Sequence, residues 1–83
     1  MAGDRLQDLI AYIASSLVDD PDAVEVNVVE EDRAIVLELT VAPDDLGKVI
    51  GRRGRTANAV RTVVGAISDR GPVRVDFVDL SGR

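Results

Sequence analysis

A run of glycines and basic residues from position 47 to 56, GKVIGRRGRT, is the stretch of this sequence best suited to bind a ligand. It contains three glycines, four basic side chains and only two large apolar residues. Gly51 and Gly54 lack a Cβ atom, so a phosphate group can come close to their main chain. Arg52 and Arg53 lie between them and cannot both point inward, so at least one should reach solvent or a phosphate. The pattern favours an anion lying along this loop.

The residues on either side of the loop add positive charge. Arg55 and Thr56 are expected to open a helix, whose N-terminus offers unpaired N–H groups and about half a positive charge. Lys48 and Arg55 flank the turn. The motif is not a P-loop, because Ala42 stands at the first glycine position and Val49 follows the lysine, and it has no G-x-G of a dinucleotide site. A glycine-rich turn with solvated arginines is the alternative that these ten residues leave open.

Charge is distributed very unevenly along the chain. The net charge is −5, yet residues 46–68 carry five basic residues and no acidic ones. The other sixty residues carry five basic and fifteen acidic residues. An acidic body with one basic segment favours a localised anion site over general binding of polyanions.

Length and composition narrow the class of protein. The 83 residues are expected to form one small domain, with a core over about residues 4–79 and a flexible tail over 80–83. The absence of cysteine and histidine removes disulfides, thiolate metal sites and the commonest general base, and no cofactor is expected. The N-terminus lacks the basic start and continuous apolar run of a signal peptide, and no stretch is long enough to span a bilayer. We therefore expect a cytoplasmic protein.

The first expected element is an amphipathic helix from about Arg5 to Val18. Asp4 and Gln7 resemble a capping box at its start, and Pro21 in the stretch DDPD ends it. Its apolar stripe consists of Leu6, Leu9, Ile10, Ile13 and Leu17.

Alternating apolar residues predict three strands. The first two cover residues 24–28 and 35–41, joined by a tight turn over the charged residues 30–33. The third covers residues 73–77, after the break at Gly71-Pro72.

Two helices are expected between the second and third strands, over residues 45–50 and 55–68. Asp44 or Asp45 can cap the first of them. The apolar stripe of the second consists of Ala57, Val60, Val64 and Ile67, with Val63 alongside.

The order α-β-β-α-α-β predicts a two-layer α+β fold, with three helices on one face of a three-stranded mixed sheet. The crossover makes the second and third strands parallel neighbours, with the first antiparallel at the edge.

The stretch GKVIGRRGRTANAVRTVV resembles the signature of the KH (K-homology) domain, with Gly51–Gly54 matching its GXXG loop. The order of elements resembles the bacterial type II form, and the resemblance covers most of the chain. In the sequence GKVIGRRGRTANAVRT and in its small size, the chain is similar to the KhpA family of single-domain bacterial KH proteins. One departure is Ala57, where many KH domains carry a larger aliphatic residue, which would make the groove floor shallower.

The resemblance implies a non-catalytic protein that binds single-stranded RNA. In KH domains the GXXG backbone and its basic residues hold the sugar-phosphate of about four nucleotides, while the bases lie in an apolar groove. The RNA-binding residues implied here are Lys48, Ile50, Gly51, Arg52, Arg53, Gly54 and Arg55. Candidates for the groove wall are Ile50, Val49, Ala57 and Leu39, although core packing is the simpler explanation for each. Arg61 is expected to be a solvated helix residue.

The resemblance also implies partners. KhpA-like proteins pair with themselves, as homodimers, and with a larger KH-containing protein, KhpB, of the Jag type. That complex binds cellular RNA as an RNA chaperone, in post-transcriptional regulation linked to cell-wall (peptidoglycan) homeostasis and cell shape. One Phe and one Tyr offer almost no stacking platform, so a single copy should bind RNA weakly and gain from avidity.

Two alternatives remain open at this point. One is a protein–protein interaction module with a minor RNA role, for which Val36 and Val78 on the outer sheet face form a candidate contact patch. The other is a small enzyme, which would have to rely on carboxylates. Those of residues 19–22 lie on a turn without EF-hand spacing, and those of residues 44–45 are explained by capping.

Overall fold

The computed structural model describes residues 2–68 and 71–78. The predicted order of elements is confirmed, and the proposed tail over residues 80–83 lies outside the described residues. The helices and strands are α1 (Ala2–Leu17), β1 (Glu25–Glu31), β2 (Ala34–Thr40), α2 (Leu46–Ile50), α3 (Arg55–Ile67) and β3 (Val73–Val78). Short 3-10 turns cover Pro21–Ala23, Pro43–Asp45 and Arg52–Gly54. None of the helices in these described ranges is long and apolar enough to cross a membrane.

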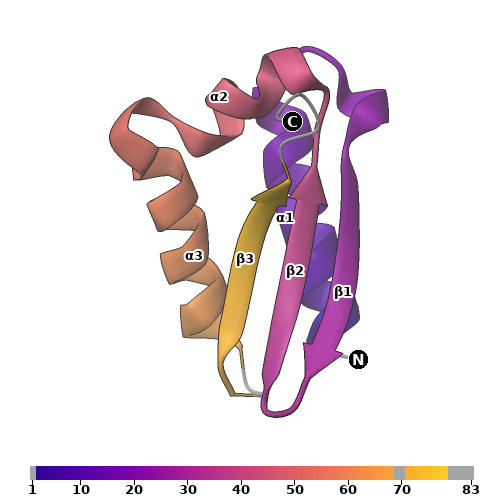
Figure 1. Cartoon of the computed structure of the whole chain (residues 1–83), viewed down its shortest axis with the longest axis vertical. Coiled ribbons are helices and arrows are strands. Elements are labelled where there is room, and N and C mark those ends of the chain that lie inside the picture. The colour runs from indigo at the N-terminus through magenta and orange to yellow at the C-terminus, as the bar shows by residue number, and fades with distance from the viewer. Residues whose placement is uncertain (1, 69–70, 79–83) are drawn as a thin grey trace.

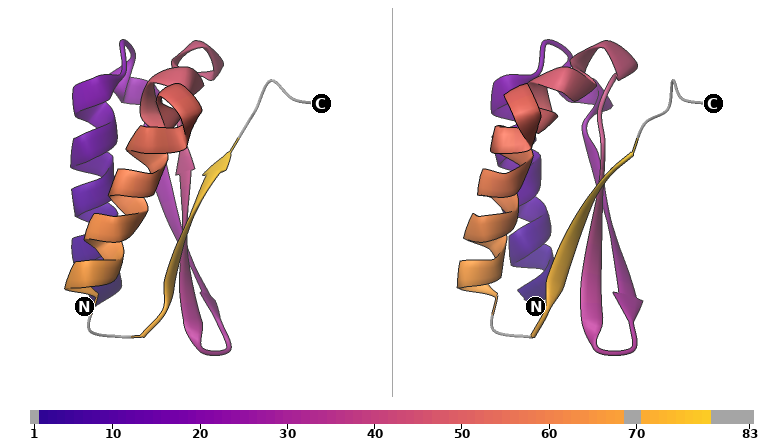
Figure 2. Two further views of the ribbon diagram at one scale, coloured as in Figure 1. Left: turned by 90° about the vertical axis from the view of Figure 1, so that its left-hand side faces the viewer. Right: turned by 60° about the vertical axis from the view of Figure 1, so that its left-hand side comes forward.

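The sheet has the predicted mixed topology. Its strand order is β1-β2-β3, with β1 antiparallel and β3 parallel to β2. All three helices lie on one face of this sheet, as the two turned views show (Figure 2). The carboxyl end of β3 and the turn between α2 and α3 lie at the same end of the molecule (Figure 1). The opposite end carries the β1–β2 hairpin.

The core lies between the sheet and the helices. Its fully enclosed members include Leu37 of β2 and Val64 of α3, both with 0% of their surface exposed. The rest of the core cluster is Leu6, Ile10, Ala14, Val26, Ile35, Leu39, Val41, Val49, Val60 and Val75. The apolar stripes expected on α1 and α3 were too long at their carboxyl ends. Leu17 is 40% and Ile67 53% exposed, because the last turn of each helix extends beyond this cluster.

The expected capping box at the start of α1 was wrong. The helix already begins at Ala2, so Asp4 lies inside it. The side-chain amide of Gln7 instead donates a hydrogen bond of 2.5 Å to the carbonyl oxygen of Val26 on β1. This bond ties α1 to the edge of the sheet, which no local sequence signal could indicate.

The outer sheet face also differs from expectation. Val36 is only 1% exposed, so it cannot belong to a contact patch with Val78. Its neighbours in the ladder are Val29 on β1 and Arg74 on β3, and Arg74 is held in place by Asp76 at 3.2 Å. The hairpin turn is also shorter than predicted, since β1 continues to Glu31 and only residues 32–33 turn.

Candidate nucleic-acid interface

The turn between α2 and α3 has an unusual backbone. Gly51 adopts φ 78° and ψ 170°, Arg53 φ 59° and ψ 24°, and Gly54 φ 75° and ψ 15°. A hydrogen bond of 3.1 Å from the Gly54 amide to the Gly51 carbonyl closes the turn. Three positive φ values within four residues direct the chain straight from the end of α2 into the start of α3. The turn is therefore a defined structure and not a loose loop.

The two glycines are needed for different reasons. A Cβ atom on Gly51 would lie 2.9 Å from the backbone nitrogen and 2.8 Å from the Cβ of Thr56, in the first turn of α3. A Cβ atom on Gly54 would have open space, with only Asn58 at 3.9 Å. The missing side chain of Gly51 thus makes room for the protein's own helix, a role that sequence reasoning missed. Gly54 leaves the outer surface of the turn open to a ligand.

The arginines of the turn face solvent. Arg52, Arg53 and Arg55 are all exposed. Over residues 2–68 and 71–78, none of the three has an ion pair or a side-chain hydrogen bond. They lie at the N-terminus of α3, where the Arg55 N–H bonds to the Arg52 carbonyl oxygen and the N–H groups that follow have no partner within the helix. The turn therefore presents three free cations and a helix start to an anion.

Lys48 is in a different situation from these arginines. Its ammonium lies 3.2 Å from a carboxylate oxygen of Asp19 and 3.2 Å from one of Asp45. The hydrogen bond that Lys48 donates to Asp19, followed by the one it donates to Asp45, raises the pKa of Lys48 above its ordinary value. Of the predicted RNA-binding residues, Lys48 is thus the one whose charge the protein already compensates. Sequence reasoning grouped it with the arginines because Asp19 lies far away in the chain.

Asp45 does not cap α2, although it stands at the predicted capping position. Its side chain makes no capping hydrogen bond and is instead buried, with 2% exposed. One carboxylate oxygen accepts a hydrogen bond of 3.0 Å from the amide of Asp20, and the other accepts one of 3.2 Å from Lys48. Burial alone would raise the pKa of Asp45, but these donors outweigh it and hold the pKa below its ordinary value. Asp45 thus fastens α2 to the segment that follows α1.

The Asp45→Asn variant should therefore lose stability and part of its acid sensitivity. Because the pKa of Asp45 is lower in the folded chain, its contribution is complete above about pH 4 and is lost as pH falls through the folded value. At pH 7 we expect the melting temperature to fall by about 5–10 °C. Below pH 3 the difference from the parent protein should shrink. Asp44→Asn is the matched control, since Asp44 is exposed in the same turn; equal losses in both variants would contradict this role.

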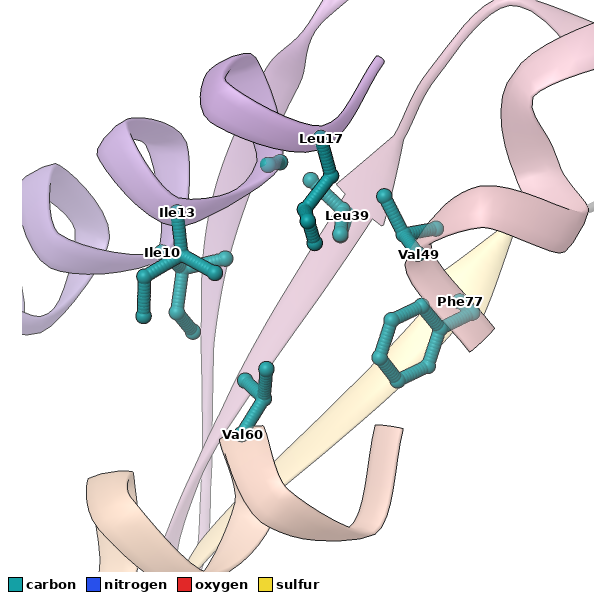
Figure 3. Close-up of a pocket in the computed structure, with 8 residues that line it drawn as sticks. Ile10, Ile13, Leu17, Leu39, Val49, Val60 and Phe77 are labelled. Carbon is teal, nitrogen blue, oxygen red and sulfur yellow. The ribbon is translucent and has the colours of Figure 1, made fainter. Parts of the chain in front are cut away.

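The predicted groove wall consists mostly of core residues. Leu39 and Ala57 are each 3% exposed and Val49 is 2% exposed, whereas Ile50 is half-buried. Beside them a small apolar hollow opens between α1, α3 and the sheet (Figure 3). Its volume is about 10 Å³, room for about one water molecule and too little for a base. Core packing therefore explains Leu39, Val49 and Ala57, and Ile50 is the member of this set that a ligand can reach.

Arg61 is exposed on α3, as expected of a solvated helix residue, but its side chain also makes contacts that were not expected. Its Nε donates a hydrogen bond of 3.2 Å to the carbonyl oxygen of Val75 on β3. Its Nη1 lies 3.3 Å from Oδ1 of Asn58, and its guanidinium carbon lies 5.2 Å from the centre of the Phe77 ring. Arg61 therefore joins α3 to β3, an arrangement that depends on the crossover between them.

The fold and the turn together define the class of protein. An α-β-β-α-α-β chain with a glycine–basic–basic–glycine turn between two helices is a KH domain of type II. The family model for the KH domain of KhpA and KhpB matches residues 7–78. The chain belongs to this KhpA/KhpB family, which is non-catalytic.

Several relatives are similar over nearly their whole length. The RNA-binding protein KhpA of Streptomyces coelicolor is 56% identical over 75 residues, which cover 90% of this chain and 94% of the relative. The KhpA of Caldanaerobacter subterraneus is 52% identical over 68 residues, or 82% and 91% of the two chains. That of Mycobacterium tuberculosis is 50% identical over 72 residues, or 87% and 89%. No solved structure matches the chain.

Proposed function

We propose that this chain binds single-stranded RNA and holds its sugar-phosphate backbone at the turn between α2 and α3. The observation that carries the proposal is the set of three exposed arginines at this turn of an otherwise acidic chain, none of which has an ion pair in the part of the chain that the structure describes. The relatives named RNA-binding proteins support the choice of RNA. The proposed contact residues are Lys48, Ile50, Gly51, Arg52, Arg53, Gly54 and Arg55.

These residues would contribute unequally to RNA binding. Arg52, Arg53 and Arg55 provide charge that no carboxylate within residues 2–68 and 71–78 compensates. The first N–H groups of α3 and the open surface of Gly54 let a phosphate approach the main chain. Ile50 contributes an apolar surface. Lys48 would contribute less than the arginines, because a phosphate must compete with Asp19 and Asp45 for its ammonium.

The test is a titration of a labelled RNA of about eight nucleotides at increasing potassium chloride concentrations. Three arginine–phosphate contacts predict that the logarithm of the association constant falls with the logarithm of salt with a slope of about −2. A duplex RNA of equal length is the control and should bind more weakly, because the turn follows a flexible single strand. Binding without salt dependence, or no binding at low salt, would overturn the proposal.

A second candidate function is contact with other protein chains, and exposed apolar side chains favour it. On α3, Val63 is 45% and Ile67 53% exposed, and on α1, Tyr12 is 74% exposed. We propose that the chain acts in the cytoplasm as a homodimer or with a KhpB (Jag-type) protein, as the resemblance to KhpA implies. In that assembly it would serve as an RNA chaperone in regulation linked to cell-wall homeostasis and cell shape. Light scattering that shows a monomer, alone and with such a partner, would remove this second candidate.

A further inference from the structure

The two carboxylates that pair with Lys48 differ sharply in their surroundings. The side chain of Asp45 is 3% exposed, and its two oxygens accept hydrogen bonds of 3.0 Å from the Asp20 amide and 3.2 Å from Lys48. The side chain of Asp19 is 82% exposed and lies 3.2 Å from the same ammonium. Asp45 is therefore a fixed part of the structure, whereas Asp19 can leave Lys48 without exposing or stranding a buried charge.

The position of Lys48 makes this difference relevant to RNA. Lys48 lies in the last turn of α2, and Gly51 follows that helix directly. Its side chain is 43% exposed, so the ammonium is accessible from solvent as well as bound to the protein. A strand held by the arginines of the turn would bring a neighbouring phosphate toward this ammonium. That phosphate meets a cation which an exposed carboxylate already occupies.

The Asp19 carboxylate offers Lys48 the same chemistry as a phosphate. Both groups are anions with oxygen acceptors, and an ammonium accepts either because it acts as a point charge with three rotatable donors. Two carboxylates around one ammonium give the cluster a net negative charge, which repels a phosphate as long as Asp19 stays in place. Its displacement costs little, because an ion pair with an exposed partner adds little stability and is screened by salt.

We propose that Asp19 is an intramolecular competitor for the Lys48 ammonium and that a phosphate of bound RNA displaces it. This inference rests on the proposed RNA-binding function and adds a specificity-determining residue outside the glycine turn. A small anion must displace Asp19 without other contacts, which disfavours its binding. A strand already held at the turn presents its phosphate at a high effective concentration, which favours the displacement. Asp19 thus reserves Lys48 for polyanions that the arginines also bind.

The fold returns the competitor to the same place when RNA leaves. α1 ends at Leu17, and its carboxyl end lies at the same end of the molecule as α2 (Figure 2). The bond from the Asp20 amide to Asp45 fixes the backbone beside Asp19. Only the exposed side chain of Asp19 needs to move, so the exchange requires no rearrangement of the helices.

The experiment compares the affinity of a labelled single-stranded RNA for Asp19→Asn and Asp20→Asn at low salt. We expect Asp19→Asn to bind about 3-fold more tightly than the parent protein, because the competitor is gone. Asp20→Asn is the matched control, since it removes the same charge from an adjacent exposed residue whose side chain has no ion pair among the described residues. Its affinity should stay close to that of the parent protein. In a Lys48→Gln background, Asp19→Asn should no longer tighten binding, because no ammonium remains to be released.

A second reading leaves Lys48 unchanged and therefore holds even if Lys48→Gln does not fold. Lys48 is the single lysine of the sequence, so isotopic labelling of lysine gives one side-chain ammonium signal in nuclear magnetic resonance spectra. In the RNA-free state this signal should differ between the parent protein and Asp19→Asn. At saturation with RNA the two signals should converge, because a phosphate is then the partner in both proteins.

Three results would overturn the competition and leave the proposed function standing. The first is an unchanged affinity of Asp19→Asn. The second is tightening that is equal in Asp20→Asn or persists in the Lys48→Gln background, which would show that overall charge acts. The third is a pair of ammonium signals that stay as far apart with RNA as without it. Absence of RNA binding to the parent protein at low salt would instead overturn the proposed function.

Discussion

Replacing Arg52 and Arg53 together by aspartate is expected to lower RNA affinity by about 100-fold or more at moderate salt. The two exposed guanidinium groups have no partner within the described residues, so their full charge is available to phosphates. Reversing both charges removes two contacts and adds repulsion. The salt slope of RNA binding should become shallower by about 1.4. Fluorescence anisotropy over a salt series measures both quantities.

The fold should survive this double substitution, which makes the loss of affinity interpretable. Neither side chain makes an ion pair with another described residue, and the positive φ of 59° at residue 53 is one that aspartate adopts more readily than most residues. The matched control is Arg5→Asp with Arg33→Asp, which changes the net charge by the same amount on α1 and on the hairpin. The hairpin between β1 and β2, to which Arg33 belongs, lies at the opposite end of the sheet from the turn (Figure 1). Equal losses of affinity in the two double variants would show that overall charge, and not the turn, holds the RNA.

Gly51→Ala is expected to have the largest effect on stability of any single substitution in the turn. The backbone of Gly51, with φ 78° and ψ 170°, lies in a region that glycine alone occupies with ease. The new Cβ would also lie 2.9 Å from the backbone nitrogen of Thr56, so the start of α3 must shift. Together these effects should cost about 3–4 kcal/mol and lower the melting temperature by roughly 15–25 °C. Thermal denaturation followed by circular dichroism measures this change.

Two neighbouring glycines provide the controls for that substitution. Gly54→Asn should cost less than about 1 kcal/mol, because its site is open and asparagine tolerates the left-handed conformation. Gly47→Ala in α2 should be neutral or slightly stabilising, since a Cβ there meets nothing within 4 Å. RNA affinity at 10 °C should fall in Gly51→Ala because the N–H groups at the start of α3 are displaced. Comparable melting temperatures for Gly51→Ala and Gly54→Asn would contradict the role assigned to Thr56.

Local patterns were sufficient for the fold and for the outline of the site. The alternation of apolar residues in β2 predicted its buried face, and the single crossover predicted that β2 and β3 are parallel. The turn was also visible, because glycines and arginines over four consecutive positions are a local signal. The uncompensated charge of Arg52, Arg53 and Arg55 was also predictable, because their segment has no carboxylates nearby in the sequence. These features depend on residues close together in the chain.

The remaining errors about the site and the outer sheet face concern contacts between residues far apart in the chain. Lys48 was grouped with the free cations, but Asp19 pairs with it from the segment that follows α1. Arg61 is exposed as expected, but its hydrogen bond to Val75 was not predicted, because the crossover brings β3 beside α3. Val36 was assigned to an exposed patch, but it is 1% exposed in the central strand, between Val29 on β1 and Arg74 on β3.

The amino-acid sequence by itself determined the order of elements, the mixed sheet and the position of the basic turn, because periodicity, glycine and charge act over a few residues. Only the tertiary structure decided which cations of the basic segment are free. Because α2 packs beside the end of α1, Lys48 pairs with the carboxylates of Asp19 and Asp45. Because α3 packs beside β3, Arg61 contacts the ring of Phe77 and the carbonyl oxygen of Val75. The physical reason is that a charge is compensated by whatever lies within a few ångströms, and folding brings those groups from distant parts of the chain.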